Sequence, residues 1–70
     1  MTVKELLQKN EGNNLHVEFW KKNEDKFDPM HETLFEGLLF DLPEKYHNWE
    51  VTRISHRLSN GEPVVEIDEP

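Results

Sequence analysis

The sequence predicts an α+β fold in which a short N-terminal helix packs on a small four-stranded antiparallel sheet. Three observations indicate this fold: a helix-capping pattern at the start, two runs of alternating apolar residues, and an Asn60-Gly61 turn between two further strands. Seventy residues without cysteine allow one small domain, residues 1–70, and no disulfide. A partly closed, SH3-like barrel is the alternative, because a small sheet twists strongly and Gly37 permits a sharp bend.

The helix is predicted over residues 2–9. Thr2 and Glu5 have the spacing of an N-cap and an N3 residue in a capping box, and Asn10 and Gly12 supply the stop. The apolar residues of this segment share one face at helical spacing: Val3, Leu6 and Leu7. Because so short a helix is unstable alone, we expect this face to dock on the sheet.

Two central strands are predicted over residues 15–20 and 33–40. The first alternates, with Leu15, Val17 and Phe19 on one face and His16, Glu18 and Trp20 on the other. The second has Leu34, Leu38 and Phe40 on one side and Phe35 and Leu39 on the other. The pattern therefore does not decide which of these two sides faces the core. A bulge at Gly37 would let both sets of apolar residues reach the core.

Residues 21–32 separate these strands and are predicted to form a long charged loop. After the second strand, Asp41-Leu42-Pro43 predicts a break followed by a helical turn over residues 43–47, with Asp41 as its cap. Tyr46 and Trp49 are expected to cover one end of the core.

The hairpin spans residues 49–68 and is closed by Asn60-Gly61, which fits a two-residue type I′ turn. This turn sets a register in which His56 faces Val65 and Arg53 faces Asp68. The predicted apolar face consists of Thr52, Ile54, His56, Leu58, Pro63, Val65 and Ile67. The opposite face carries Arg57 diagonal to Glu66, and residues 68–70 are expected to be a frayed tail.

The charge is unevenly distributed. The formal net charge is −7, and residues 23–50 hold eight acidic and two basic residues. This balance argues against direct nucleic-acid binding, which needs basic residues to neutralise phosphates, and it favours a protein partner or plain solubility. We expect a cytoplasmic protein without membrane contact, because no stretch has the apolar length of a bilayer span and the first residues do not read as a signal peptide.

No catalytic, cofactor or metal signature is present, so the chain is not expected to be an enzyme or to hold a cofactor. The four histidines are His16, His31, His47 and His56. Asp28, His31 and Glu32 form the best local grouping for a metal, but this spacing matches no known ligand motif, and we predict solvent-exposed histidines. His56 is expected at the edge of the core, where a buried neutral ring would make acid destabilising.

The candidate interface residues are those of the charged loop and the strand before it: Trp20, Glu24, Asp25, Asp28 and Glu32. Trp20 projects from the face opposite Phe19, and an exposed Trp is a typical anchor of protein interfaces. The alternative is that the sheet curls or the loop folds back, which would make Trp20 an ordinary core residue.

Several short segments carry a resemblance. They are Thr-Val-Lys-Glu-Leu-Leu at 2–7, Phe35-Glu36-Gly37, Asp41-Leu42-Pro43, Trp-Glu-Val-Thr-Arg-Ile at 49–54, and Glu66-Ile67. In these the chain resembles small uncharacterised proteins encoded by phages and prophages of Gram-positive bacteria. The resemblance implies a phage protein in the host cytoplasm that acts on a host or phage protein, and it carries no catalytic residue.

The leading hypothesis is a non-enzymatic protein-interaction module. An acidic DNA mimic that inhibits a nucleic-acid enzyme is one alternative, and it requires carboxylates in rows at phosphate-like intervals. A small structural or homo-oligomeric component is the other, since a bare strand edge can pair between copies.

Overall fold

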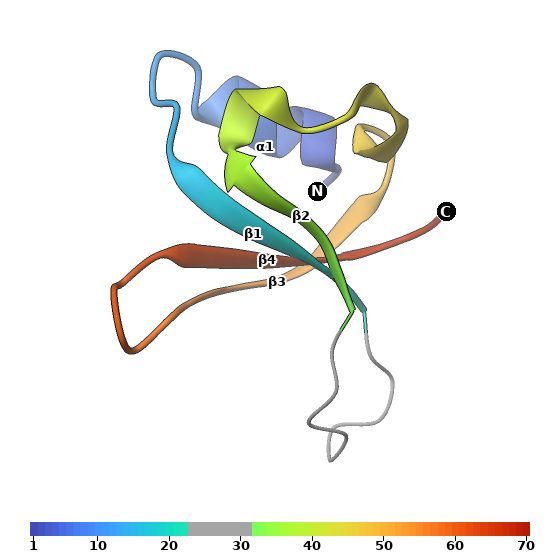
Figure 1. Ribbon diagram of the computed structural model, residues 1–70. Coiled ribbons are helices and arrows are strands. Elements are labelled where there is room, and N and C mark those ends of the chain that lie inside the picture. Colours follow the sequence, from blue (N-terminus) through green and yellow to red (C-terminus); the bar gives the residue numbers. More distant parts are fainter. Residues whose placement is uncertain (23–31) are drawn as a thin grey trace.

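The computed structural model of the protein describes residues 1–22 and 32–70 (Figure 1). The elements are α1 (Val3–Lys9), β1 (His16–Lys21), β2 (Thr33–Leu38), the 3₁₀ turns η1 (Leu39–Asp41) and η2 (Glu44–Tyr46), β3 (Glu50–His56) and β4 (Pro63–Asp68). The helix and the two 3₁₀ turns form one layer over one face of the sheet (Figure 1). The predicted α+β class, with an N-terminal helix on four strands, is confirmed.

The sheet has the strand order β2-β1-β4-β3. The β1–β2 and β3–β4 pairs are antiparallel as predicted, whereas β1 and β4 are parallel, so the sheet is mixed. The parallel pair arises because the chain leaves β2 at one edge, passes over the sheet through η1 and η2, and enters again at the opposite edge as β3. The β3–β4 turn then brings β4 back beside β1, and this leaves an open sheet rather than a closed barrel.

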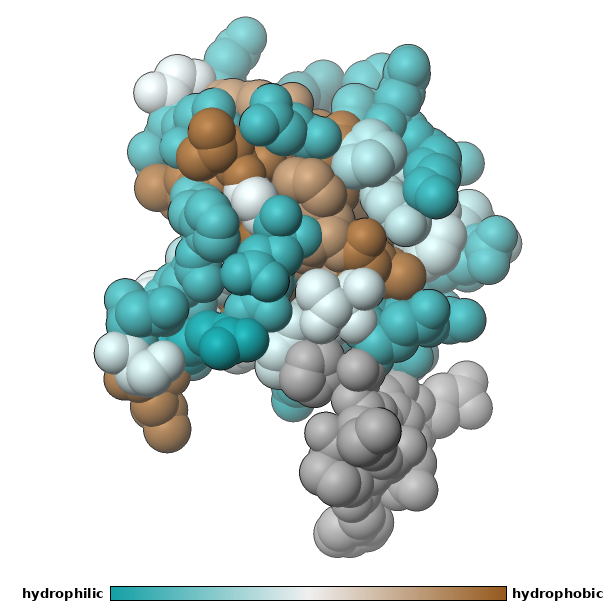
Figure 2. Space-filling model, viewed as in Figure 1, coloured by the Kyte–Doolittle hydropathy of each residue, from teal (hydrophilic) through white to brown (hydrophobic). Residues whose placement is uncertain are grey.

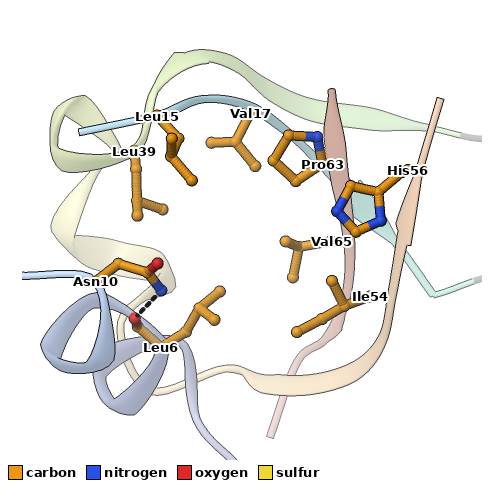
Figure 3. A pocket seen from close by; sticks show the side chains of 9 residues that line it. All are labelled: Leu6, Asn10, Leu15, Val17, Leu39, Ile54, His56, Pro63 and Val65. Carbon is orange, nitrogen blue, oxygen red and sulfur yellow. Dashed lines mark hydrogen bonds between the residues drawn. The ribbon is translucent and has the colours of Figure 1, made fainter. Parts of the chain in front are cut away.

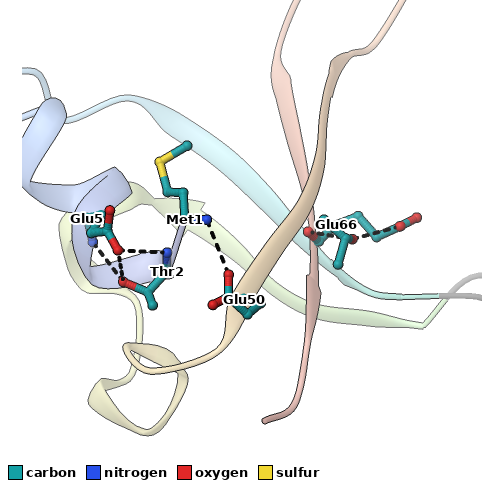
Figure 4. A network of polar contacts seen from close by, with 6 residues as sticks. Met1, Thr2, Glu5, Glu50 and Glu66 are labelled. Atoms are coloured by element: carbon teal, nitrogen blue, oxygen red, sulfur yellow. Dashed lines mark hydrogen bonds and ion pairs between the residues drawn. The ribbon is translucent and has the colours of Figure 1, made fainter.

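The start of α1 is capped as its sequence predicts. The Glu5 amide donates to Thr2 Oγ1 at 3.3 Å, and the Thr2 amide donates to Glu5 Oε1 at 3.3 Å, which completes the capping box (Figure 4). At the other end Asn10 is the C-cap residue, and its side-chain amide donates to the Leu6 carbonyl at 2.9 Å. These bonds satisfy groups that a seven-residue helix cannot satisfy within itself.

We predict that Thr2→Ala destabilises the fold by about 1 kcal/mol. Alanine lacks the hydroxyl oxygen that accepts from the Glu5 amide, and this amide has no partner within the helix. For a domain of this size the loss corresponds to a melting temperature lower by about 4–8 °C, measurable by circular dichroism. Thr2→Ser keeps the hydroxyl and is the control, with little change expected. Equal melting temperatures for Thr2→Ala and Thr2→Ser would contradict the role of the cap.

The core lies between the helical layer and the sheet. Its buried side chains are Val3, Leu6, Val17, Phe19, Leu39, Leu42, Tyr46, Val65 and Ile67. Tyr46 and Trp49 meet edge to face, with ring centroids 5.0 Å apart, and Trp49 packs against the core. The prediction that these two rings cover one end of the core is confirmed. The cap of this 3₁₀ turn is Pro43, however, and Asp41 lies in η1.

The inward side of β2 is settled by the packing. Leu34 and Phe35 both pack against the core, and the Phe35 ring lies 6.2 Å from that of Phe19 between centroids. A bulge in β2 permits this. Phe19 pairs with Phe35 and the next residue, Trp20, pairs with Thr33, so Leu34 is the extra residue between them. The prediction of a bulge at Gly37 is therefore wrong. Gly37 stays in register with Val17. A Cβ atom at position 37 would lie 3.2 Å from the Phe35 ring.

The β3–β4 register differs from the prediction by two residues. His56 pairs with Pro63 rather than Val65, and the Arg57 amide donates to the Glu62 carbonyl at 2.9 Å, so four residues form the turn. Within this four-residue turn only Gly61 has a positive φ, +70°, and the Asn60 side chain accepts from the Glu62 amide at 2.9 Å. The prediction of a two-residue type I′ turn is therefore wrong. Such a turn needs a positive φ at Asn60, whereas Asn60 has a negative φ and its side chain accepts a hydrogen bond from the backbone two residues later.

A shift of two residues leaves most side chains on their predicted faces, because the period of a strand is two. Ile54 and Val65 still face the core layer, opposite one another. A bulge between Val51 and Arg53 turns Val51 inward and Thr52 outward. Leu58, predicted on the apolar face, lies in the turn and is fully exposed. The tail begins later than predicted, since Asp68 belongs to β4 and pairs with Glu50.

Candidate functional site

A groove opens on the core side of the sheet, between the end of α1 and the β3–β4 hairpin (Figure 3). Its volume is about 250 Å³. The residues that line it are Leu6, Asn10, Leu15, Val17, Leu39, Ile54, His56, Pro63 and Val65. Figure 3 shows these side chains converging on one hollow from α1, β1, η1 and both strands of the hairpin. We call this hollow the apolar groove.

The apolar groove exists because the helical layer is smaller than the sheet. The helix is seven residues long, so its apolar face covers only part of four strands. Leu15 and Ile54 have apolar side chains that are 40% and 46% exposed, although both belong to the face that forms the core. Burial of the part of such a side chain that is still exposed is favourable by about 1 kcal/mol, which makes an uncovered hollow of this kind a typical contact surface.

Two polar side chains stand in this apolar lining. The Asn10 amide already donates to the Leu6 carbonyl, which holds it against the helix end. His56 is exposed at the rim and presents ring nitrogens that donate or accept hydrogen bonds. The groove can therefore hold an apolar side chain and offer polar contacts at its border. The predicted acid destabilisation by a buried His56 loses its basis, since the ring is in contact with solvent.

The face of the sheet opposite the helix holds a buried carboxylate. Glu18 is 2% exposed, its Oε1 accepts from Trp20 Nε1 at 3.3 Å, and its Oε2 pairs with Arg57 Nε. This burial does not follow from the sequence pattern, because alternation alone marks Glu18 as solvent-facing. One sequence signal for this burial is Trp20. It lies two residues after Glu18, on the same face of β1, so its large ring can cover the Glu18 side chain.

The ion pairs of β3 follow the observed register. Arg53 lies 3.6 Å from Glu66 and Arg57 lies against Glu18, so the predicted pairs with Asp68 and Glu66 are wrong. Thr52 Oγ1 donates to Glu66 Oε1 at 2.9 Å, and the N-terminal amine of Met1 contacts Glu50 Oε2 at 3.2 Å (Figure 4). These contacts join β3 to β4 and the first residue of the chain to β3.

The predicted interface residues are only partly placed by the structure. Trp20 projects from the face opposite Phe19 as predicted, but it is half-buried and its indole donates to Glu18. Glu32 is exposed at the same end of the sheet, where its carbonyl accepts from the Lys21 amide at 2.9 Å. The remaining three lie outside the described residues: Glu24, Asp25 and Asp28. The acidic interface therefore stays a prediction.

Across residues 1–22 and 32–70, no three His, Asp or Glu side chains lie together as a metal ion requires. The grouping of Asp28, His31 and Glu32 falls mainly outside the described residues. His16 contacts Glu62 through Nδ1, which ties the start of β1 to the β3–β4 turn.

Further apolar surface lies outside the apolar groove. Figure 2 shows brown side chains gathered over the end of β2 and the turn that follows it, and again at the tip of the β3–β4 turn. Leu38, Phe40 and Leu58 are 42%, 43% and 106% exposed. These residues line no part of the groove and therefore provide control positions for experiments on it.

Comparison with protein-family models, with curated proteins and with solved structures finds no match for this chain. Within the part of the chain that the structure describes, no helix is both long enough and apolar enough to span a bilayer.

Proposed function

We propose that the protein is a non-enzymatic protein-interaction module whose apolar groove receives an apolar side chain of a protein partner. The observation that carries this proposal is the exposure of Leu15 and Ile54 on the wall of a hollow of about 250 Å³ that residues 1–22 and 32–70 leave uncovered. The resemblance to small phage-encoded proteins extends the proposal to a phage accessory protein that acts on a host or phage protein in the host cytoplasm.

The proposal predicts that Ile54→Lys abolishes partner binding, because the charged side chain would have to be buried with the incoming apolar group. Binding is measured by capture from a Gram-positive bacterial lysate at moderate salt, with mass spectrometry of the retained proteins. Leu58→Lys is the matched control, since Leu58 is fully exposed and lies outside the groove. Circular dichroism establishes that both variants fold.

The expected result is a protein that is retained by the wild type and by Leu58→Lys and is absent with Ile54→Lys. Equal retention by all three proteins would show that the apolar groove is not the contact. Loss with Leu58→Lys alone would move the contact to the tip of the hairpin.

A further inference from the structure

The outer edge of β3 already accepts an extended segment of its own chain. The Val51 amide donates to the Met1 carbonyl at 2.8 Å, and the Val3 amide donates to the Trp49 carbonyl at 2.9 Å. Thr2 and Glu50 form an antiparallel bridge between these two bonds. The first residues of the chain thus cover the beginning of this edge.

Beyond Val51 the edge is open. The strand order places β3 at the border of the sheet, and no other described strand pairs with residues 53–56 on this side. The backbone groups of an open edge form a template for a further strand. The open part of the β3 edge is therefore a continuation of an edge that binds extended chain elsewhere in the same molecule.

The open edge borders the apolar groove. Ile54 and His56 belong to this part of β3, and both side chains line the groove (Figure 3). Successive side chains of an added strand would point to opposite faces of the sheet. Every second side chain of that strand would therefore enter the groove, and the apolar lining calls for apolar residues at those positions.

The other face of the same edge carries two exposed arginines, each paired with a carboxylate. The side chains of Arg53 and Arg57 are 65% and 43% exposed, in a chain whose net charge is −7. Their carboxylate partners lie further inside the sheet, where the Glu66 and Glu18 side chains are 18% and 3% exposed. A strand added at the edge would thus meet guanidinium groups first, and carboxylates on its outer face would be complementary to them.

We propose that residues 53–57 of this edge bind an extended acidic segment of a partner protein by strand addition, with apolar and acidic side chains in alternation. The inference rests on the proposed function, since it names the chemistry of the segment that the apolar groove receives. A second copy of the chain fits less well, because pairing two β3 edges would bring arginines from both copies together.

The probe for this inference is a capped, fluorescently labelled peptide of alternating Val and Glu, titrated by fluorescence anisotropy. Two control peptides have the same length: one has the same residues as a Val block followed by a Glu block, and the other alternates Val and Lys. Amide hydrogen exchange of the isotopically labelled protein locates the binding. Arg53→Gln tests the contact of the peptide with the guanidinium group, and Lys4→Gln removes an exposed positive charge from α1 as its control.

We expect the Val–Glu peptide to bind and to slow exchange at amides of residues 53–56, while both control peptides bind less tightly. Arg53→Gln should weaken binding about two- to fivefold, the usual range for a cross-strand charge pair, with no effect of Lys4→Gln. Ile54→Lys should remove binding.

Three results would overturn the inference and leave the proposed function standing. These are equal binding of the block peptide, binding without slower exchange on β3, and no peptide binding while lysate capture still depends on Ile54. Equal binding of the Val–Lys peptide would overturn the acidic chemistry. Loss of both peptide binding and Ile54-dependent capture would be a failure of the proposed function itself. A particle mass that doubles with concentration and protects the same amides would assign the edge to a second copy and overturn the inference.

Discussion

Phe19→Ala is expected to leave most of the chain unfolded at room temperature. Phe19 has no exposed surface and lies on β1, which pairs with both β2 and β4. Its ring also packs against Phe35. Truncation of a buried Phe costs about 3–5 kcal/mol, and a single core in a domain of this size rarely supplies more than about 3–5 kcal/mol in total.

Urea unfolding followed by circular dichroism measures this effect, and the dispersion of amide signals in NMR reports on the folded fraction. Phe40→Ala is the matched control, because it removes the same ring from a side chain that is 43% exposed and outside the buried core. We expect the control to cost less than about 1 kcal/mol. A Phe19→Ala protein with a normal unfolding midpoint would show that β1 is not the centre of the core.

Arg57→Met is expected to destabilise the fold by about 2–3 kcal/mol. Methionine keeps much of the apolar stem of the arginine but removes the guanidinium that pairs with Glu18. The Glu18 side chain is 3% exposed, and a buried carboxylate that loses its charge partner retains the cost of its desolvation.

The matched control for Arg57→Met is Arg53→Met. The Arg53–Glu66 pair is more open to solvent, so its loss should cost less than about 1 kcal/mol. Adding Glu18→Gln to Arg57→Met removes the buried charge and keeps an acceptor for the Trp20 indole, and we expect this double variant to recover part of the stability. Equal unfolding free energies for Arg57→Met and Arg53→Met would contradict a structural role for the Arg57–Glu18 pair.

Sequence reasoning placed the side chains that line the apolar groove on the correct faces of their strands, but it did not reveal that these side chains are exposed. Ile54 and His56 were assigned to the apolar face of the hairpin, and Leu15 to that of its strand, and all three line the groove. Their exposure was not predicted, because the pattern tells which face a residue occupies and not whether another element covers it. A seven-residue helix opposite four strands was the available sign that part of this face stays open.

Local interactions explain what the sequence by itself determined. The capping box of Thr2 and Glu5 depends on residues three apart, and alternation along β1 and β4 marks the inward positions of Phe19 and Ile67 wherever their strands pair. The helix and the four strands could therefore be predicted from neighbouring residues alone, although the second strand ends at Leu38 and Leu39–Asp41 form η1 rather than its continuation.

Only the tertiary structure decided the parallel pairing of β1 with β4, the turn around Asn60, the burial of Glu18 and the uncovered groove beside Ile54. Each of these depends on which distant segment lies next to a residue. Strand order is set by how the whole chain crosses the sheet, and a two-residue change of register leaves the apolar pattern almost unchanged. For that physical reason the sequence pattern determines the elements and their faces, and long-range packing determines the neighbours that make the site.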